Sequence, residues 1–168
     1  MSTSRRHASA AIDRWSHRGV LMSTEDVLHG SLEAWNAHDR DRWIEYAAES
    51  IEVLVSGGVR ASGVEGAAQL YDTWHEAFPD NRVEPALTLV EGVNGMHESH
   101  FRGTHTGTMR GPGGDIPATG RSVNIPFVAL LAVKGDKLTS FRVYFDLLDM
   151  LGQLGLTESV ADEPALTR

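Results

Sequence analysis

The chain has 168 residues, of which 41% are hydrophobic and 23% are charged, with a formal net charge of −8 and no cysteine. This composition predicts one globular domain, and the lack of a basic stripe argues against binding to nucleic acid. No apolar run is long enough to cross a membrane, and the absence of cysteine excludes disulfides, thiolate metal sites and a cysteine nucleophile, in keeping with a cytoplasmic protein.

Residues 1–23 differ in composition from the rest, because they are polar, rich in Arg and Ala, and lack the apolar segment of a secretory signal. We expect them to form a flexible extension, followed by one domain over residues 24–157 and a tail over residues 158–168. A first helix is expected to open at Ser23 or Thr24, with Thr24 as the N-cap, since acidic residues follow in its first turn. Apolar residues then repeat at helical spacing as far as Trp35.

A second short helix is expected around Trp43, then a strand over residues 51–56 and a third helix over residues 63–78. Four longer strands follow, within residues 82–92, 95–109, 121–133 and 137–148, and turn residues separate them. Helices first and antiparallel strands afterwards predict an α+β fold, a cone-shaped barrel in which a bent, mostly antiparallel sheet wraps around three N-terminal helices. Such a cone encloses one cavity, which is a natural site for a hydrophobic small molecule.

Asp146 is the main candidate for acid/base chemistry. It follows the last predicted strand, and the segment after it is strongly apolar, so burial is expected to raise its pKa toward neutrality. Arg142, Tyr144 and Asp146 share one face of that strand because side chains alternate. The alternative interpretation is that Asp146 caps a helical turn after the strand.

The histidines of the predicted strand over residues 95–109 are the next candidates. His100 and His105 lie on opposite faces, because their separation is odd, and only one of them can point inward. His105 has glycines beside it on its own face, which leave space for a ligand, although a partly exposed His bonded to a neighbour fits equally well. His97 lies on the opposite face from Glu98 and His100, so we expect no metal site in this cluster.

Three segments, FRGTHTGTMRG, PATGRSV and KLTSFRVYFDLLDMLGQLGL, are preceded in the chain by AWNAHD and WHEAFPD. Together these segments resemble the SnoaL-like polyketide cyclases of the nuclear-transport-factor-2-like superfamily, and the resemblance covers about residues 24–156. It implies a lyase or isomerase of natural-product biosynthesis that closes a ring in a polyketide-type intermediate by an aldol-like reaction, without a metal or organic cofactor. It also implies a homodimer formed through the convex face of the sheet, to which apolar residues 127–133 would contribute.

The resemblance also implies roles for individual residues. Asp146 matches the aspartate that acts as general acid/base in the family, whereas the family's histidine has no counterpart in residues 127–133, so His105 is the candidate partner. A hydrogen-bond donor for the developing enolate oxygen would come from Tyr144, Arg142 or His105. The expected substrate-binding residues are Tyr144, Arg142, Trp35, Trp74, His75 and Phe78, although the aromatic ones and His75 also suit a simple core.

Two other functions stay open at this point. One is a cofactor-free epoxide hydrolase or isomerase of the same superfamily, and hydrolysis would require a second polar partner beside Asp146 to hold the water. The other is a non-catalytic module for ligand binding or dimerisation, which a self-filled pocket and an Asp146 outside it would favour.

Overall fold

The computed structural model describes residues 22–111 and 113–157, and these form four helices and six strands. The helices are α1 (Thr24–Asn36), α2 (Arg40–Glu45), α3 (Gly63–Ala77) and α4 (Leu147–Gln153). The strands are β1 (Ala47–Val55), β2 (Val59–Ser62), β3 (Arg82–Glu91), β4 (Asn94–Thr104), β5 (Ser122–Lys134) and β6 (Lys137–Phe145). The extension expected over residues 1–23, apart from its last two residues, and the tail expected over residues 158–168 lie outside the described residues.

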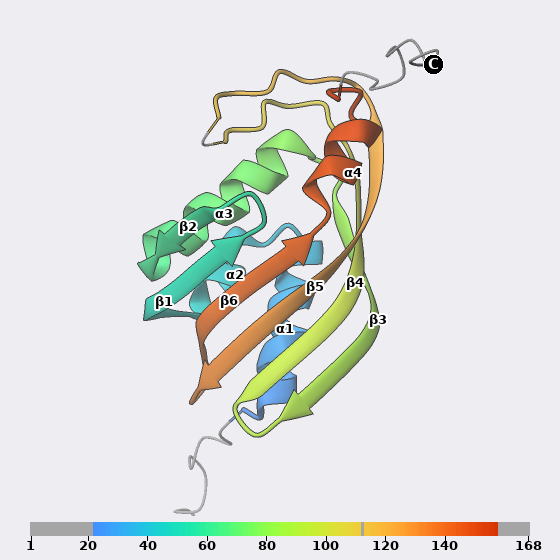
Figure 1. The fold of residues 1–168 in the computed structure, drawn as a ribbon. Helices are drawn as coiled ribbons and strands as arrows, with labels where there is room; N and C mark the ends of the chain where they lie inside the picture. Colours follow the sequence, from blue (N-terminus) through green and yellow to red (C-terminus); the bar gives the residue numbers. More distant parts are fainter. Residues whose placement is uncertain (1–21, 112, 158–168) are drawn as a thin grey trace, which may run out of the picture.

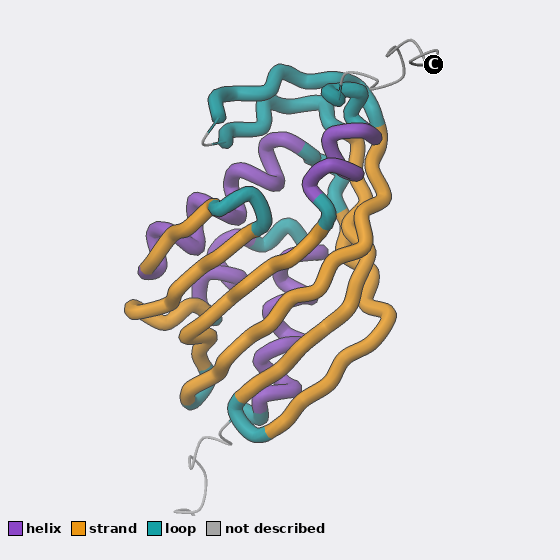
Figure 2. Tube along the Cα trace, in the orientation of Figure 1, coloured by secondary structure: helices purple, strands orange, loops and turns teal. Residues whose placement is uncertain are grey.

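All six strands belong to one sheet with the order β2-β1-β6-β5-β4-β3. Neighbouring strands are antiparallel except β1 and β6, which run parallel. Figures 1 and 2 show the twisted sheet with α1, α2 and α3 gathered on one side of it, while α4 follows the end of β6. The predicted α+β class, with N-terminal helices and a mostly antiparallel sheet, is confirmed.

Alternation of side chains in β4 distinguishes the face covered by the helices, here called the inner face, from the outer face. His97, Ser99 and Phe101 are buried, whereas Glu98 between them is exposed. Gly95 continues the inner face, and a Cβ atom there would overlap with the Leu28 side chain. The missing side chain therefore lets α1 pack closely against the sheet.

The first helix begins one residue earlier than the favoured prediction. Ser23, not Thr24, is the N-cap, and it forms a capping box with Asp26. The prediction of Thr24 as the cap is wrong because its hydroxyl instead donates a hydrogen bond of 2.7 Å to the carbonyl of Gly92 in the β3–β4 turn. This contact ties the start of the helix to the sheet that it covers.

One apolar core fills the space between the helices and the inner face. Its least exposed large side chains come from distant parts of the chain and include Val27, Ile51, Phe78, Ile125 and Leu154. Burial of such side chains is the main stabilising contribution to a domain of this size. Within the described residues, every helix is too short or too polar to cross a lipid bilayer.

Candidate functional site

An apolar cavity lies between α1, α3 and the inner face of the sheet. The cavity has a volume of about 60 Å³. It lies within a larger hollow of about 490 Å³, which includes the space on its open side. All of its lining residues are apolar or aromatic: Trp35, Val55, Leu70, Trp74, Val83, Phe101, Ile125, Phe127, Phe141, Val143 and Phe145. A ligand of two or more rings therefore requires some of these aromatic side chains to turn aside.

The last strand contributes three lining residues, and they are not the ones expected. Phe141, Val143 and Phe145 point inward from β6, whereas Arg142 and Tyr144 are exposed on the outer face. The prediction that Arg142 and Tyr144 line the pocket is wrong, because the apolar set of the alternating strand faces the core. They share a face, as predicted, but it is the outer one.

Asp146 lies outside the cavity lining and is exposed. Its Oδ1 accepts hydrogen bonds from the backbone N–H groups of Leu148, at 2.9 Å, and Asp149, at 3.0 Å, so the residue is the N-cap of α4. The apolar burial expected for this carboxylate is absent, because the first N–H groups of a helix need an acceptor. Asp146 nevertheless directly follows Phe145, which lines the cavity.

His105 points inward and is completely buried, whereas His100 lies on the outer face, as their odd separation predicted. The Nδ1 atom of His105 accepts a hydrogen bond of 3.3 Å from the backbone N–H of Thr119, which leaves the proton of the neutral ring on Nε2. That Nε2 has no hydrogen-bond partner among the described residues. Burial lowers the pKa of His105.

The structure does not bring His105 and Asp146 together. Thr104, the last residue of β4, pairs with Ser122, while Phe145, the last residue of β6, pairs with Phe127. The two pairs are five residues apart along β5, or about 16 Å at roughly 3.3 Å per residue. The two predicted catalytic residues therefore lie at different places along the sheet and do not form a dyad.

The four predicted binding residues of the helices divide into two groups. Trp35 and Trp74 line the cavity, as expected. Phe78 does not line it, and its buried ring packs instead between Trp74 and His105. His75 does not line it either, so the predictions for Phe78 and His75 as cavity residues are wrong.

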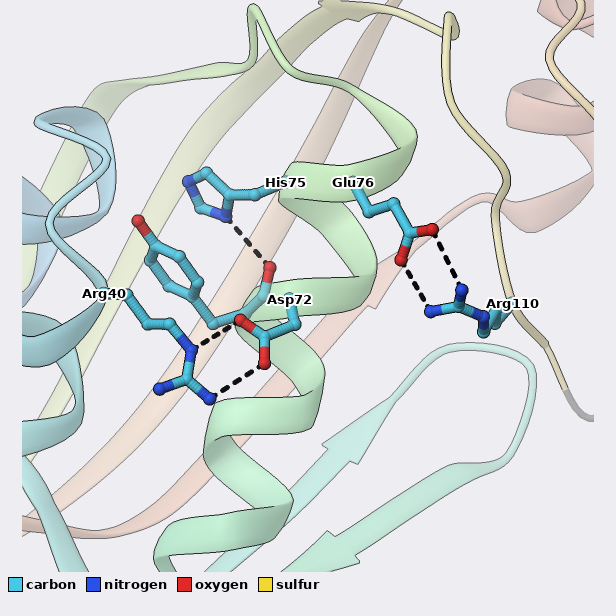
Figure 3. Close-up of polar contacts among 6 residues, drawn as sticks. Arg40, Asp72, His75, Glu76 and Arg110 are labelled. Atoms are coloured by element: carbon cyan, nitrogen blue, oxygen red, sulfur yellow. Dashed lines mark hydrogen bonds and ion pairs between the residues drawn. The ribbon is translucent and has the colours of Figure 1, made fainter.

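His75 is held by backbone groups rather than by a ligand site (Figure 3). Its Nδ1 lies 3.0 Å from the carbonyl oxygen of Tyr71, its Nε2 lies 3.2 Å from that of Trp35, and its ring stacks on the Tyr71 ring. Burial lowers its pKa, although the two carbonyl contacts oppose this effect. These contacts identify His75 as a residue of the helix packing.

Ion pairs anchor both flanks of α3 (Figure 3). Asp72 accepts two hydrogen bonds from Arg40, which lower its carboxyl pKa, and Glu76 accepts two from Arg110 in the loop after β4. Because these side chains are largely exposed, each pair contributes little to stability. They connect α2 and the loop to the helix that carries Trp74.

Two polar features near the cavity were missed in the sequence. Asn81 is buried, and its Oδ1 accepts a hydrogen bond of 2.8 Å from the Nε1 of Trp35, so it orients a lining side chain. His97 and Ser99 are both buried on the inner face of β4, with 2.7 Å between Nδ1 and Oγ. The sequence feature that could have identified His97 is its even separation from Phe101 on one strand, which places both side chains on the same face. Among the described residues, no three His, Asp or Glu side chains are grouped as metal ligands.

Comparisons with known proteins agree with this architecture. The family model described as SnoaL-like polyketide cyclase matches residues 25–154. A protein of Jannaschia sp. CCS1, proposed to be a SnoaL-like polyketide cyclase, is 21% identical over 86% of this chain and 100% of its own, with a TM-score of 0.72. No curated protein sequence shows a significant match.

Two further solved structures show how varied the relatives of this fold are. IdmH of Streptomyces antibioticus, proposed to be a polyketide cyclase, is 23% identical over 79% of this chain and 98% of its own, with a TM-score of 0.65. An epoxide hydrolase of M. tuberculosis is 18% identical over 78% of this chain and 88% of its own, with a TM-score of 0.61. At such identities the likeness concerns the fold and leaves the chemistry to the site.

Proposed function

We propose that this chain, which belongs to the SnoaL-like polyketide cyclase family, is an enzyme of natural-product biosynthesis that closes a ring in a polyketide-type intermediate without a cofactor. The observation that carries the proposal is the cavity, because all eleven of its lining side chains are apolar or aromatic. Such a lining favours a ligand whose folded part is largely apolar. The cavity is also placed where α1, α3 and five strands can hold two ends of one molecule together.

The proposed reaction is an intramolecular aldol closure. A base removes a proton from a carbon next to a carbonyl group, the resulting enolate carbon attacks a second carbonyl carbon of the same molecule, and a carbon–carbon bond forms. The second carbonyl oxygen becomes an alkoxide and takes up a proton, so the proton that was removed is returned. Since the lining carries no charge, much of the acceleration would come from holding the two reacting carbons close together.

Asp146 is the proposed acid/base, acting at the edge of the cavity rather than inside it. Its Oδ1 accepts both capping hydrogen bonds, and its Oδ2 has no partner among the described residues. The Oδ2 atom could therefore exchange a proton with a substrate that reaches past Phe145. His105 would not share this step, given its separation from Asp146 along β5.

The test uses a triketone that closes to a bicyclic ketol. Samples taken at intervals are treated with acid, which removes water from the ketol, and the absorbance of the resulting conjugated enone measures how much ring closure has occurred. The chain should accelerate closure over buffer, and Asp146→Asn should lower that acceleration by roughly 10²–10⁴, the usual contribution of a positioned acid/base. Asparagine is as good an N-cap as aspartate, so α4 should keep its start. Asp149→Asn, a change of the neighbouring exposed carboxylate, should leave the rate unchanged. Equal rates for the chain and Asp146→Asn would reject Asp146 as the acid/base.

A non-catalytic ligand-binding module is the second candidate function. The lining of the cavity favours this function, because none of the described residues around it has an ionisable side chain. Epoxide hydrolysis is less well supported, since the cavity lining formed by residues 22–111 and 113–157 offers no polar residue to hold the attacking water beside Asp146. Binding of an apolar probe without any acceleration of ring closure would favour the binding module.

We also propose that the chain forms a homodimer through the outer face of the sheet. Two rows of residues that pair across β3, β4, β5 and β6 on this face are mainly apolar. The first row is Leu89, Met96, Leu130 and Arg142, and the second is Leu87, Glu98, Val128 and Tyr144. Leu87, Leu89, Leu130 and Tyr144 are each 40–53% exposed, which is high for large apolar side chains on neighbouring strands. A second copy of the chain would cover this patch.

A further inference from the structure

The His97–Ser99 pair is a buried polar feature of the inner face that the proposed reaction leaves unused. His97 is 7% exposed and Ser99 is fully buried. The Nδ1 of His97 lies 2.7 Å from the Oγ of Ser99, two residues along the same strand. Burial of an imidazole and a hydroxyl in an apolar core is unfavourable unless both are hydrogen-bonded. The contact between them satisfies Nδ1 of His97 and the Ser99 hydroxyl, whereas Nε2 of His97 has no hydrogen bond to a described residue.

The pair contacts one of the aromatic residues that line the cavity. Ser99 pairs across the sheet with Phe127, and the His97 ring packs edge-on against the Phe127 ring, with 5.6 Å between the ring centroids. Phe127 lines the cavity, as does Phe101, which follows Ser99 by two residues on the same face. A rotation of the Phe127 ring would therefore connect the pair to the cavity.

The chemistry of the pair suits an uncharged oxygen on the ligand. Burial lowers the pKa of His97 to about 4, so the ring is neutral near pH 7 and offers one N–H and one lone pair. If the Ser99 hydroxyl donates to Nδ1, the proton lies on Nε2, and Nε2 makes no hydrogen bond to any other described residue. A neutral N–H donor in an apolar site favours a ketone or hydroxyl oxygen, whereas a carboxylate or phosphate would favour a cationic ring.

We infer that His97 and Ser99 form the polar end of the ligand site, where the His97 Nε2–H donates a hydrogen bond to a ketone or hydroxyl oxygen of the bound molecule. The apolar rings of that molecule fill the cavity, and Ser99 fixes the orientation and tautomer of the imidazole. The ligand class is therefore an uncharged polycyclic or chain ketone. This inference rests on the proposed function, because it assumes that the cavity holds the ligand.

The experiment compares two probes of the same shape, α-tetralone, which carries one ketone, and tetralin, which carries none. Their dissociation constants are measured by titration into the full chain and into His97→Asn, which retains a polar atom near Ser99 but has none at the Nε2 position. One added hydrogen bond predicts that the chain binds α-tetralone about fivefold more tightly than tetralin. In His97→Asn the two probes should bind equally, with the tetralin constant unchanged.

The matched control is His100→Asn, a histidine change on the outer face of the same strand, which should leave both constants unchanged. Should His97→Asn fail to fold, nitrogen NMR of the His97 ring in the unmodified chain replaces it, and only α-tetralone should shift the Nε2 signal. Equal binding of both probes to the chain, or a ketone preference that survives in His97→Asn, overturns the inference while the cavity proposal stands. If neither probe binds, the cavity proposal itself fails and the inference fails with it.

Discussion

Acidification should destabilise the protein through His97, and the size of the effect follows from its burial. A histidine in an unfolded chain titrates near pH 6.5, whereas burial lowers the pKa of His97 to about 4 in the folded protein. Between these two values the unfolded state binds a proton that the folded state does not, so stability falls as the pH falls. Above the unfolded pKa the residue contributes no pH dependence.

This change in pKa lowers the free energy of unfolding by about 3 kcal/mol once the pH is below both pKa values, and by about 2 kcal/mol at pH 5. The assay is urea unfolding at several pH values between 7 and 4.5, for the unmodified chain and for His97→Asn, which cannot titrate in this range. Burial also lowers the pKa values of His75 and His105, so both proteins should lose stability on acidification. The difference between the two proteins isolates His97.

The free energy of unfolding should fall by about 2 kcal/mol more in the unmodified chain than in His97→Asn between pH 7 and pH 5. Carboxyl groups whose pKa values are lowered by hydrogen bonds, such as those of Asp72 and Asp80, are common to both proteins and cancel in the comparison. An equal loss of stability in the two proteins would refute the burial argument for His97. It would also remove the reason for treating this imidazole as neutral in the ligand site.

Three other expectations concern the cap, a close backbone approach and the outer face. Asp146→Ala should lower the free energy of unfolding by about 1 kcal/mol while Asp146→Asn lowers it little, and equal urea midpoints for both would reject the capping role. Gly107→Ala should lower the free energy of unfolding by roughly 1–3 kcal/mol, because the added Cβ would overlap with the Glu76 carbonyl oxygen. Gly113→Ala should be nearly neutral in the same urea assay, because no atom of the described residues outside its chain neighbours lies within 4 Å of a Cβ at this position. Sedimentation should give a dimer for the unmodified chain at tens of micromolar and a monomer for Leu130→Lys, and a monomeric unmodified chain would contradict the proposed dimer.

Much of the fold was predictable because its signals are local. The period of apolar residues, the acidic first turn after Ser23, and the Pro79 that follows the third helix all act within a few residues of the chain. The antiparallel strands after α3 were predictable for the same reason, since turn residues separate them. The parallel pairing of β1 with β6 was not predictable, because it joins segments far apart in the sequence.

The site was only partly predictable, and Asp146 shows why. Alternation in β6 separates Phe141, Val143 and Phe145 from Arg142 and Tyr144, but it does not state which set faces the cavity. The preference for a catalytic role assigned the polar set to the interior, whereas apolar burial assigns the aromatic set there. Beyond Phe145 the strand ends, and the N–H groups of the following helix bind the Asp146 carboxylate.

His97 marks the boundary between what the sequence determines and what the tertiary structure decides. The sequence by itself determined its face, because parity along a strand separates it from Glu98 and groups it with Phe101. Its burial, the 2.7 Å contact with Ser99 and its packing against Phe127 depend on α1 covering β4 and on the register between β4 and β5. A pKa depends on the water and charges around a group. Those surroundings come from residues distant in the chain, so only the assembled structure fixes the chemistry of this histidine.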